Sequence, residues 1–225
     1  MKKIIFGLIC LVFSTSATAQ IHEIGLALGG SNYVGDIGPT DYFKPNKLAG
    51  GILYKWNKSP RHAWRASFTQ TTLASNDRDS KVPSRRDRGY SFRTTTQELS
   101  LGLEFNFFPF DLHSLRPQLT PYIYSGLSAV RYDNQYFING GTEYDKKELT
   151  MAIPMVVGVK ANISPRWVLA AEIGARYTYT DNLDASNPDI TNAVKFGNTN
   201  SNDWFMFSLL SLTYTFGNNP CFCPE

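Results

Sequence analysis

The dominant pattern along this chain is alternation of apolar and polar residues, which is typical of β-strands that bury one face. Long amphipathic helical patterns are absent. Eight alternating runs span about residues 23–33, 48–56, 64–71, 98–107, 122–132, 151–162, 169–179 and 206–216. The fourth is the clearest, with Leu99, Leu101, Leu103, Phe105 and Phe107 on one face. In the fifth run, Tyr122 and Tyr124 compete with Ile123 and Leu127 for the apolar face, which leaves its phase open.

The faces opposite the apolar residues distinguish a soluble β-sandwich from a membrane barrel, since alternation alone permits both. Small glycine, alanine and serine residues line these faces, together with four acids and four bases: Glu23, Glu98, Glu104 and Glu172, and Lys55, Arg65, Lys160 and Arg176. A sandwich would show such charges to water with no need for balance. The balance suits a narrow lumen plugged by ion pairs. The sequence therefore predicts an all-β fold, an eight-stranded antiparallel transmembrane outer-membrane β-barrel of meander topology. A soluble periplasmic sandwich or lipocalin-like barrel is the alternative.

The lengths of the runs and of their connections favour the same fold. Strands of about ten residues, tilted near 40°, cover the roughly 25 Å apolar band of an outer membrane. Connections are short after Trp56 and Ile163, medium after Phe108, and long at 34–47, 74–91, 137–148 and 181–203. Short periplasmic turns and long external loops are typical of outer-membrane barrels. Aromatic residues fit two interfacial girdles: Trp56, Trp64 and Trp167 near the short turns, and Tyr132, Tyr136, Tyr177, Tyr179 and Trp204 near the opposite rim.

The first nineteen residues have the order of a secretory signal peptide, with Lys2 and Lys3 before an apolar segment and small residues at 17–19. The apolar segment is about ten residues long, whereas a membrane-spanning helix needs roughly twenty. We therefore expect a signal peptide at 1–19, a barrel at 20–217 and a periplasmic tail at 218–225. Loss of the two lysines and no acid lowers the formal charge from +3 to +1, which gives no reason to expect a nucleic-acid partner.

Candidate catalytic and metal-binding residues are few. The three histidines, His22, His62 and His113, each fall at a predicted strand end or turn, so none is placed with a serine and an acid for acyl transfer. The loop carboxylates lack the spacing of a calcium loop and are expected to be solvated. We predict no catalytic residue, no metal and no cofactor. The charged loop at 77–93 could contact anionic lipopolysaccharide, although mixed-charge runs are usually solvated.

Two cysteines, Cys221 and Cys223, lie in the C-terminal tail. One intervening residue strains an internal disulfide and falls short of a four-ligand zinc set. In an oxidising periplasm such thiols pair with each other or with another chain, and a plain disordered tail is the alternative.

Several ordered segments resemble one family, the PorG-like small outer-membrane barrels of the type IX secretion system of Bacteroidetes. The matching stretches are GGSNYVGDIG at 29–38, EFNFFP at 104–109, TPY at 120–122, WVL at 167–169, EIG at 172–174, RYTYTD at 176–181, LD at 183–184, YTFG at 214–217, PC at 220–221 and CP at 223–224. The resemblance implies a barrel that couples a periplasmic ring, formed by a lipoprotein and a ring protein (PorK and PorN in that family), to the outer membrane during protein secretion. It carries over no catalytic residue.

The expected partners are outer-membrane lipid, lipopolysaccharide and this periplasmic ring. The predicted ring-contacting residues are Lys58, Pro60, Arg61, Phe110, His113, Arg116, Cys221, Phe222 and Cys223, on the short turns and the tail. A stand-alone porin or adhesin-like barrel is the first alternative, although an eight-stranded lumen is just filled by side chains. A lipid-acting barrel enzyme is the second.

Overall fold

A computed structural model describes residues 21–112, 114, 116–138, 141–188, 193–198 and 201–217. Eight antiparallel strands follow one another around a closed barrel, and β1 pairs with β8 to close it. The strands are β1 (Ile21–Val34), β2 (Lys47–Asn57), β3 (His62–Asn76), β4 (Ser91–Asn106), β5 (Leu119–Ile138), β6 (Gly141–Ser164), β7 (Trp167–Thr178) and β8 (Trp204–Phe216). The predicted fold class and meander topology are confirmed.

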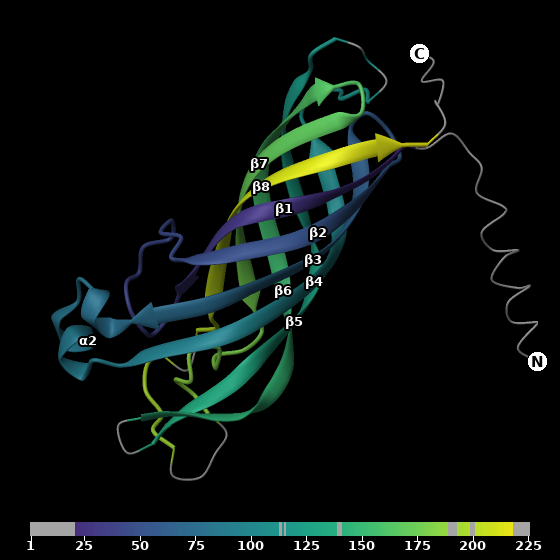
Figure 1. The fold of residues 1–225 in the computed structure, drawn as a ribbon. Coiled ribbons are helices and arrows are strands. Elements are labelled where there is room, and N and C mark those ends of the chain that lie inside the picture. Colours follow the sequence, from purple (N-terminus) through teal and green to yellow (C-terminus); the bar gives the residue numbers. More distant parts are fainter. Residues whose placement is uncertain are drawn as a thin grey trace, which may run out of the picture.

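The two ends of the barrel differ in their connections. β1 begins and β8 ends at the same end, which also carries the short β2–β3 and β6–β7 turns and the β4–β5 connection (Figure 1). The long β1–β2, β3–β4 and β7–β8 connections and the extended β5–β6 hairpin lie at the opposite end. There the β3–β4 connection holds a 3₁₀ turn, η1 (Asp77–Asp79), and a short helix, α2 (Pro83–Arg88). Proline in its first turn and Gly89 at φ 71° after its last residue bound α2 to six residues. We call the short-turn end periplasmic and the other end external.

Large apolar side chains cover the outside of the wall. Leu26 is 61% exposed, Leu101 60% and Val157 61%, and each belongs to the apolar face expected from sequence or its continuation around the barrel. A water-soluble monomer rarely exposes an apolar surface of this extent. The outer wall therefore faces lipid acyl chains. Among the described residues, no helix is long and apolar enough to span a membrane.

The strands extend further at the external end than the sequence pattern indicated. The segment 137–148, expected as a loop, is largely the end of β5 and the start of β6, paired from Ile138↔Gly141 to Tyr132↔Glu148. On β6 the alternation fades because residues 142–147 are exposed on both faces, so no apolar face marks this part of the strand. The phase of β5 is also settled: Tyr122 and Tyr124 are each 1% exposed and point inward, whereas Ile123 and Leu127 face outward.

The prediction that Tyr132 belongs to the outer aromatic girdle is wrong. Tyr132 is 2% exposed and points inward, where its hydroxyl donates to the Oε2 of Glu148 at 3.1 Å. Tyr179 and Trp204, by contrast, lie on the outer surface, with Tyr177 packed against both rings. The polar hydroxyl of tyrosine allows either face, so alternation did not decide its side.

Candidate functional site

The eight predicted plug residues all lie inside the barrel, and each is at most 5% exposed. Glu104 on β4 is the centre of the first group. Its Oε1 accepts a hydrogen bond from Lys160 at 2.6 Å and one from Lys55 at 3.0 Å. Its Oε2 lies 2.8 Å from the Lys55 ammonium and 3.8 Å from the Arg65 guanidinium. One carboxylate from β4 thus joins cations that come from β2, β3 and β6.

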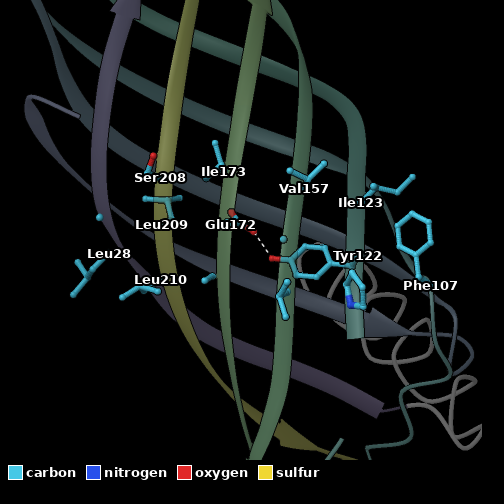
Figure 2. A pocket seen from close by; sticks show the side chains of 15 residues that line it. Leu28, Phe107, Tyr122, Ile123, Val157, Glu172, Ile173, Ser208, Leu209 and Leu210 are labelled. Carbon is cyan, nitrogen blue, oxygen red and sulfur yellow. Dashed lines mark hydrogen bonds between the residues drawn. The ribbon is translucent and has the colours of Figure 1, made fainter. Parts of the chain in front are cut away.

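Arg65 links this group to a second carboxylate. Its two terminal nitrogens donate to the Oε2 and Oε1 of Glu172 at 2.7 and 2.8 Å, a two-pronged pairing that fixes both side chains. The Tyr122 hydroxyl donates to Glu172 Oε2 at 2.6 Å (Figure 2). Tyr122 reaches β7 from β5 by crossing β6 at Gly158, where a Cβ would lie 2.6 Å from the tyrosine ring. Glycine at 158 is therefore required for this contact.

The other two acids complete the plug. Glu98 on β4 pairs with Arg176 on β7, whose Nε lies 3.2 Å from Oε2. Glu23 on β1 accepts hydrogen bonds from Asn57 at 2.8 Å and Thr213 at 2.7 Å. The barrel interior is thus crossed by ionic and hydrogen-bonded contacts rather than left open.

The sequence pattern placed small residues on the inward faces but did not indicate that aromatic rings stack with the lumenal cations. The Arg65 guanidinium lies 4.7 Å from the ring centre of Tyr124, and that of Arg176 lies 4.7 Å from the ring centre of Phe207. Such stacking holds a desolvated cation in one orientation. The available signal was the phase of the runs, because Tyr124 and Phe207 each lie an even number of residues from another inward position.

The periplasmic mouth is closed from below by the β4–β5 turn. Phe110 is 4% exposed and packs with Leu112 and Val168, and the Lys160 ammonium lies 5.0 Å from the centre of its ring. Phe110 therefore offers almost no side-chain surface to a partner in this structure, although it was predicted to contact one. The physical reason is that the underside of the charged lumen offers this ring an apolar and cation-facing site.

The other predicted contact residues divide into two sets. Lys58, Arg61 and Arg116 are exposed on the periplasmic turns, and Pro60 is partly exposed between the first two. His113, Cys221, Phe222 and Cys223 lie outside the described residues, as do the predicted signal peptide and periplasmic tail.

The external mouth is covered by connections that pack on one another. Asp77 is fully buried and accepts from the backbone of Gly38 at 2.8 Å, while Arg88 binds both of its oxygens at 2.7 and 3.0 Å. Arg88 also donates to the carbonyl of Asp36 at 2.7 Å and stacks 4.5 Å from the ring centre of Phe196. The expectation that these loop carboxylates are solvated is therefore wrong for Asp77, and the loops form an ordered cap.

A pair of buried carboxyl groups anchors the last connection in this cap. Asp184 is fully buried and Asp203 is 2% exposed. Asp203 accepts from the Tyr33 hydroxyl and, at 2.9 Å, from the backbone of Leu183. Burial raises the pKa of both carboxyl groups, and the charge of Asp184 adds to the rise at Asp203. The cap therefore favours the protonated form of this pair.

The pKa of Asp181, which lies next to this pair, is also raised. Burial and the charge of Asp36 raise its pKa to about 6. Within the described part of the chain, no three histidine, cysteine or acidic side chains are grouped so as to hold a metal ion.

The described histidines are at the periplasmic rim. His22 stacks on Tyr54, with its Nδ1 at 2.7 Å from the tyrosine hydroxyl, and the His62 Nδ1 lies 3.2 Å from the Ser59 hydroxyl. Among the described residues, neither of these contacts includes a carboxylate.

Several solved structures align with this chain at low sequence identity. Neisserial surface protein A aligns with a TM-score of 0.50 and 11% identity, over 88% of this chain and 97% of that chain. A major outer membrane protein from Thermus thermophilus aligns with a TM-score of 0.48 and 12% identity, over 88% and 100%. The N-terminal barrel domain of Pseudomonas aeruginosa OprF gives 0.47 and 10%, over 88% and 97%.

The first of these supports the outer-membrane eight-stranded barrel fold, and no function follows from it. No curated protein matches the sequence. A family model matches residues 2–225, which is nearly the whole length. The chain belongs to the family described as "Domain of unknown function (DUF6089)".

Proposed function

We propose that this protein is a non-catalytic outer-membrane barrel that anchors or couples a periplasmic secretion ring of the type IX kind to the outer membrane. The observation that carries the proposal is the plugged lumen. Its centre is crossed by Lys55, Glu104 and Lys160, and Phe110 closes it below. A barrel without an aqueous path serves through its surfaces rather than its interior. The choice of this ring as partner rests on the sequence segments that resemble, in the same order, the small barrels of that secretion system.

The plug also suits a mechanical role. A buried ion pair is a poor source of net stability, because desolvation offsets most of its attraction, but it does fix the relative position of the elements it joins. Glu104 joins β4 to β2 and β6 in this way, and Glu172 joins β7 to β3 and β5. Ties across the barrel resist shear between strands. A load applied at the periplasmic rim would then be carried by the entire wall.

The exposed part of the periplasmic rim supplies a surface for the ring. Two turns are tied into one unit: the Phe110 amide donates to the Pro60 carbonyl at 3.0 Å, and the Arg61 guanidinium donates to the Phe107 carbonyl at 3.0 Å. Lys58, Arg61 and Arg116 project from this unit. We propose that these three cations, with the C-terminal tail, contact the ring lipoprotein and ring protein.

The test is recovery of the two ring proteins with the tagged barrel after gentle detergent extraction from its own host. The variant K58E/R61E/R116E should stay folded, shown by heat-modifiable migration on gels, and should lose most of the ring proteins. The matched control R78E/R86E/K195E reverses three exposed cations at the external end and should recover the ring proteins as the wild type does. Deletion of residues 218–225 should also weaken recovery. Absence of ring proteins from the wild-type extract would reject the proposal.

A stand-alone adhesin-like barrel is the second candidate. The observation in its favour is the ordered external cap, whose Arg88–Asp77 contact holds the β3–β4 connection as a defined surface rather than a mobile tip. If bacteria that express the barrel but no ring protein still attach to host cells, this candidate would be favoured.

A further inference from the structure

The outer wall changes character along one row of residues at the external end. Cross-strand pairing sets Phe68, Leu99, Ala129 and Met151 side by side on β3 to β6, and all four are apolar. The next outward-facing row is Gln70, Gln97, Arg131 and Leu149. Two residues along a strand span about 7 Å. Arg131 is therefore the first cation above the acyl-chain band on this side of the barrel.

Beyond Arg131, strands β4 to β6 carry further charges of both signs, among them Lys147, Asp133 and Arg93. The Lys147 ammonium lies 3.7 Å from a carboxylate oxygen of Asp133, whose other oxygen accepts from the Thr95 amide at 3.4 Å. This pair is internally neutral. Arg93, opposite Ala74 on β3, is exposed on the same outer face, four residues beyond Gln97 along β4. Within the described parts of the chain, neither Arg93 nor Arg131 forms an ion pair with a carboxylate, so both guanidinium groups are available to an anionic ligand.

We infer that Arg131 and Arg93, with the amides of Gln97 and Gln70, form a binding site for the phosphorylated headgroup of an outer-leaflet glycolipid, lipid A. Four residues of strand place the two arginines roughly 13 Å apart along the wall, which suits a headgroup with more than one phosphate. Each guanidinium presents a planar fork of donors that matches phosphate oxygens. The glutamine side chains, hydrogen-bonded to each other at 3.4 Å, retain further donors and acceptors for the sugar.

Position in the membrane selects this ligand over a free anion. The site lies on the lipid-facing wall, directly above Leu99 and Ala129, so the acyl chains of a bound lipid would continue onto the apolar row below. The external end faces the outer leaflet. Two arginines of the β3–β4 connection, Arg85 and Arg88, are turned onto the carbonyls of Gly35 and Asp36 and do not face the lipid.

The test uses purified barrel in detergent micelles and native mass spectrometry, with bisphosphorylated lipid A as the probe. The wild type should retain lipid A, and R93Q/R131Q should bind it at least about tenfold more weakly, since each substitution removes a charge-assisted contact. The control R78Q/R86Q removes two exposed cations from the cap instead and should bind lipid A as the wild type does. Heat-modifiable migration checks that each variant is folded.

Two further probes separate the possible ligands. Dephosphorylated lipid A should bind the wild type about as weakly as intact lipid A binds the double variant. Phosphatidylglycerol should bind more weakly than lipid A. Equal retention of lipid A by wild type and R93Q/R131Q would overturn the inference, as would equal loss in R78Q/R86Q. Preferential, arginine-dependent binding of phosphatidylglycerol would overturn the assignment to the glycolipid.

Discussion

Replacing Glu104 by glutamine tests the plug at its most connected residue. The carboxylate has an ammonium at 2.6 Å, a second at 2.8 Å and a guanidinium at 3.8 Å, and its side chain is fully buried. Glutamine preserves the shape and removes the charge. Lys55 and Lys160 then lose their ion-pair partner among the described residues, whereas Arg65 retains Glu172.

The expected cost is about 3–5 kcal/mol, the range for leaving a buried charge uncompensated. It does not double for two lysines, because a buried ammonium can release its proton instead of staying charged. The whole folded state of a domain is usually worth about 5–15 kcal/mol, so the loss is readily measured. A second substitution, K160M, removes one orphaned ammonium, and E104Q/K160M should lose less stability than the sum of the two single variants.

The assay is equilibrium urea unfolding of the barrel in lipid vesicles, followed by heat-modifiable migration on gels. E143Q is the matched control, because Glu143 is exposed on β6 and, among the described residues, accepts a hydrogen bond from the hydroxyl of Tyr136 alone, at 2.9 Å; it should change stability by less than about 0.5 kcal/mol. An E104Q variant as stable as E143Q would show that the lumenal charges are solvated. That result would refute the plug as described.

Three further predictions concern the two ends. The folded cap binds more protons than the unfolded loop between the ordinary aspartate pKa near 4 and the raised pKa values of Asp184 and Asp203, so its stability falls as pH rises; the protection factors of amides 181–188, which correct for the pH dependence of intrinsic exchange, should be higher at pH 5 than at pH 8, and D184N/D203N should reduce the difference. R88K should lower local stability by roughly 1.5–3 kcal/mol, because lysine cannot hold both oxygens of Asp77, and faster cleavage by external protease measures it; unchanged cleavage contradicts the ordered cap. F110A should lose roughly 3–5 kcal/mol in urea unfolding with no loss of ring proteins, since Phe110 is buried; selective loss of ring proteins would restore it to the contact surface.

The strands and the lumenal charges could be predicted because a period of two places each residue on one face or the other. Glu98 and Glu104 are six residues apart, so once one is inside the other must be. Alternation does not decide which face a tyrosine takes, because its ring suits lipid and its hydroxyl suits a polar lumen. Tyr122 is compatible with the lipid face by composition, and contacts that the sequence pattern does not show favour its inward position: the space at Gly158, the carboxylate of Glu172 and the ammonium groups of Lys55 and Lys160 over its ring.

The cap could not be predicted from sequence, since its contacts join residues far apart in the chain. Asp203 receives the Tyr33 hydroxyl from 170 residues away. Asp77 looks like any loop carboxylate until the β3–β4 connection folds back on it. Phe110 likewise resembles an interfacial aromatic next to a turn, and its burial depends on how the turn packs beneath the barrel. Side-chain packing between loops produces no repeating pattern in the sequence from which it could be predicted.

The closed lumen is tested most directly by ion conductance of the purified wild-type barrel in planar bilayers. The plug of Glu104, Glu172 and their cations, with Phe110 beneath it, predicts no steady channels above the bare-membrane leak. Channels of a defined, reproducible conductance in the wild type would contradict it.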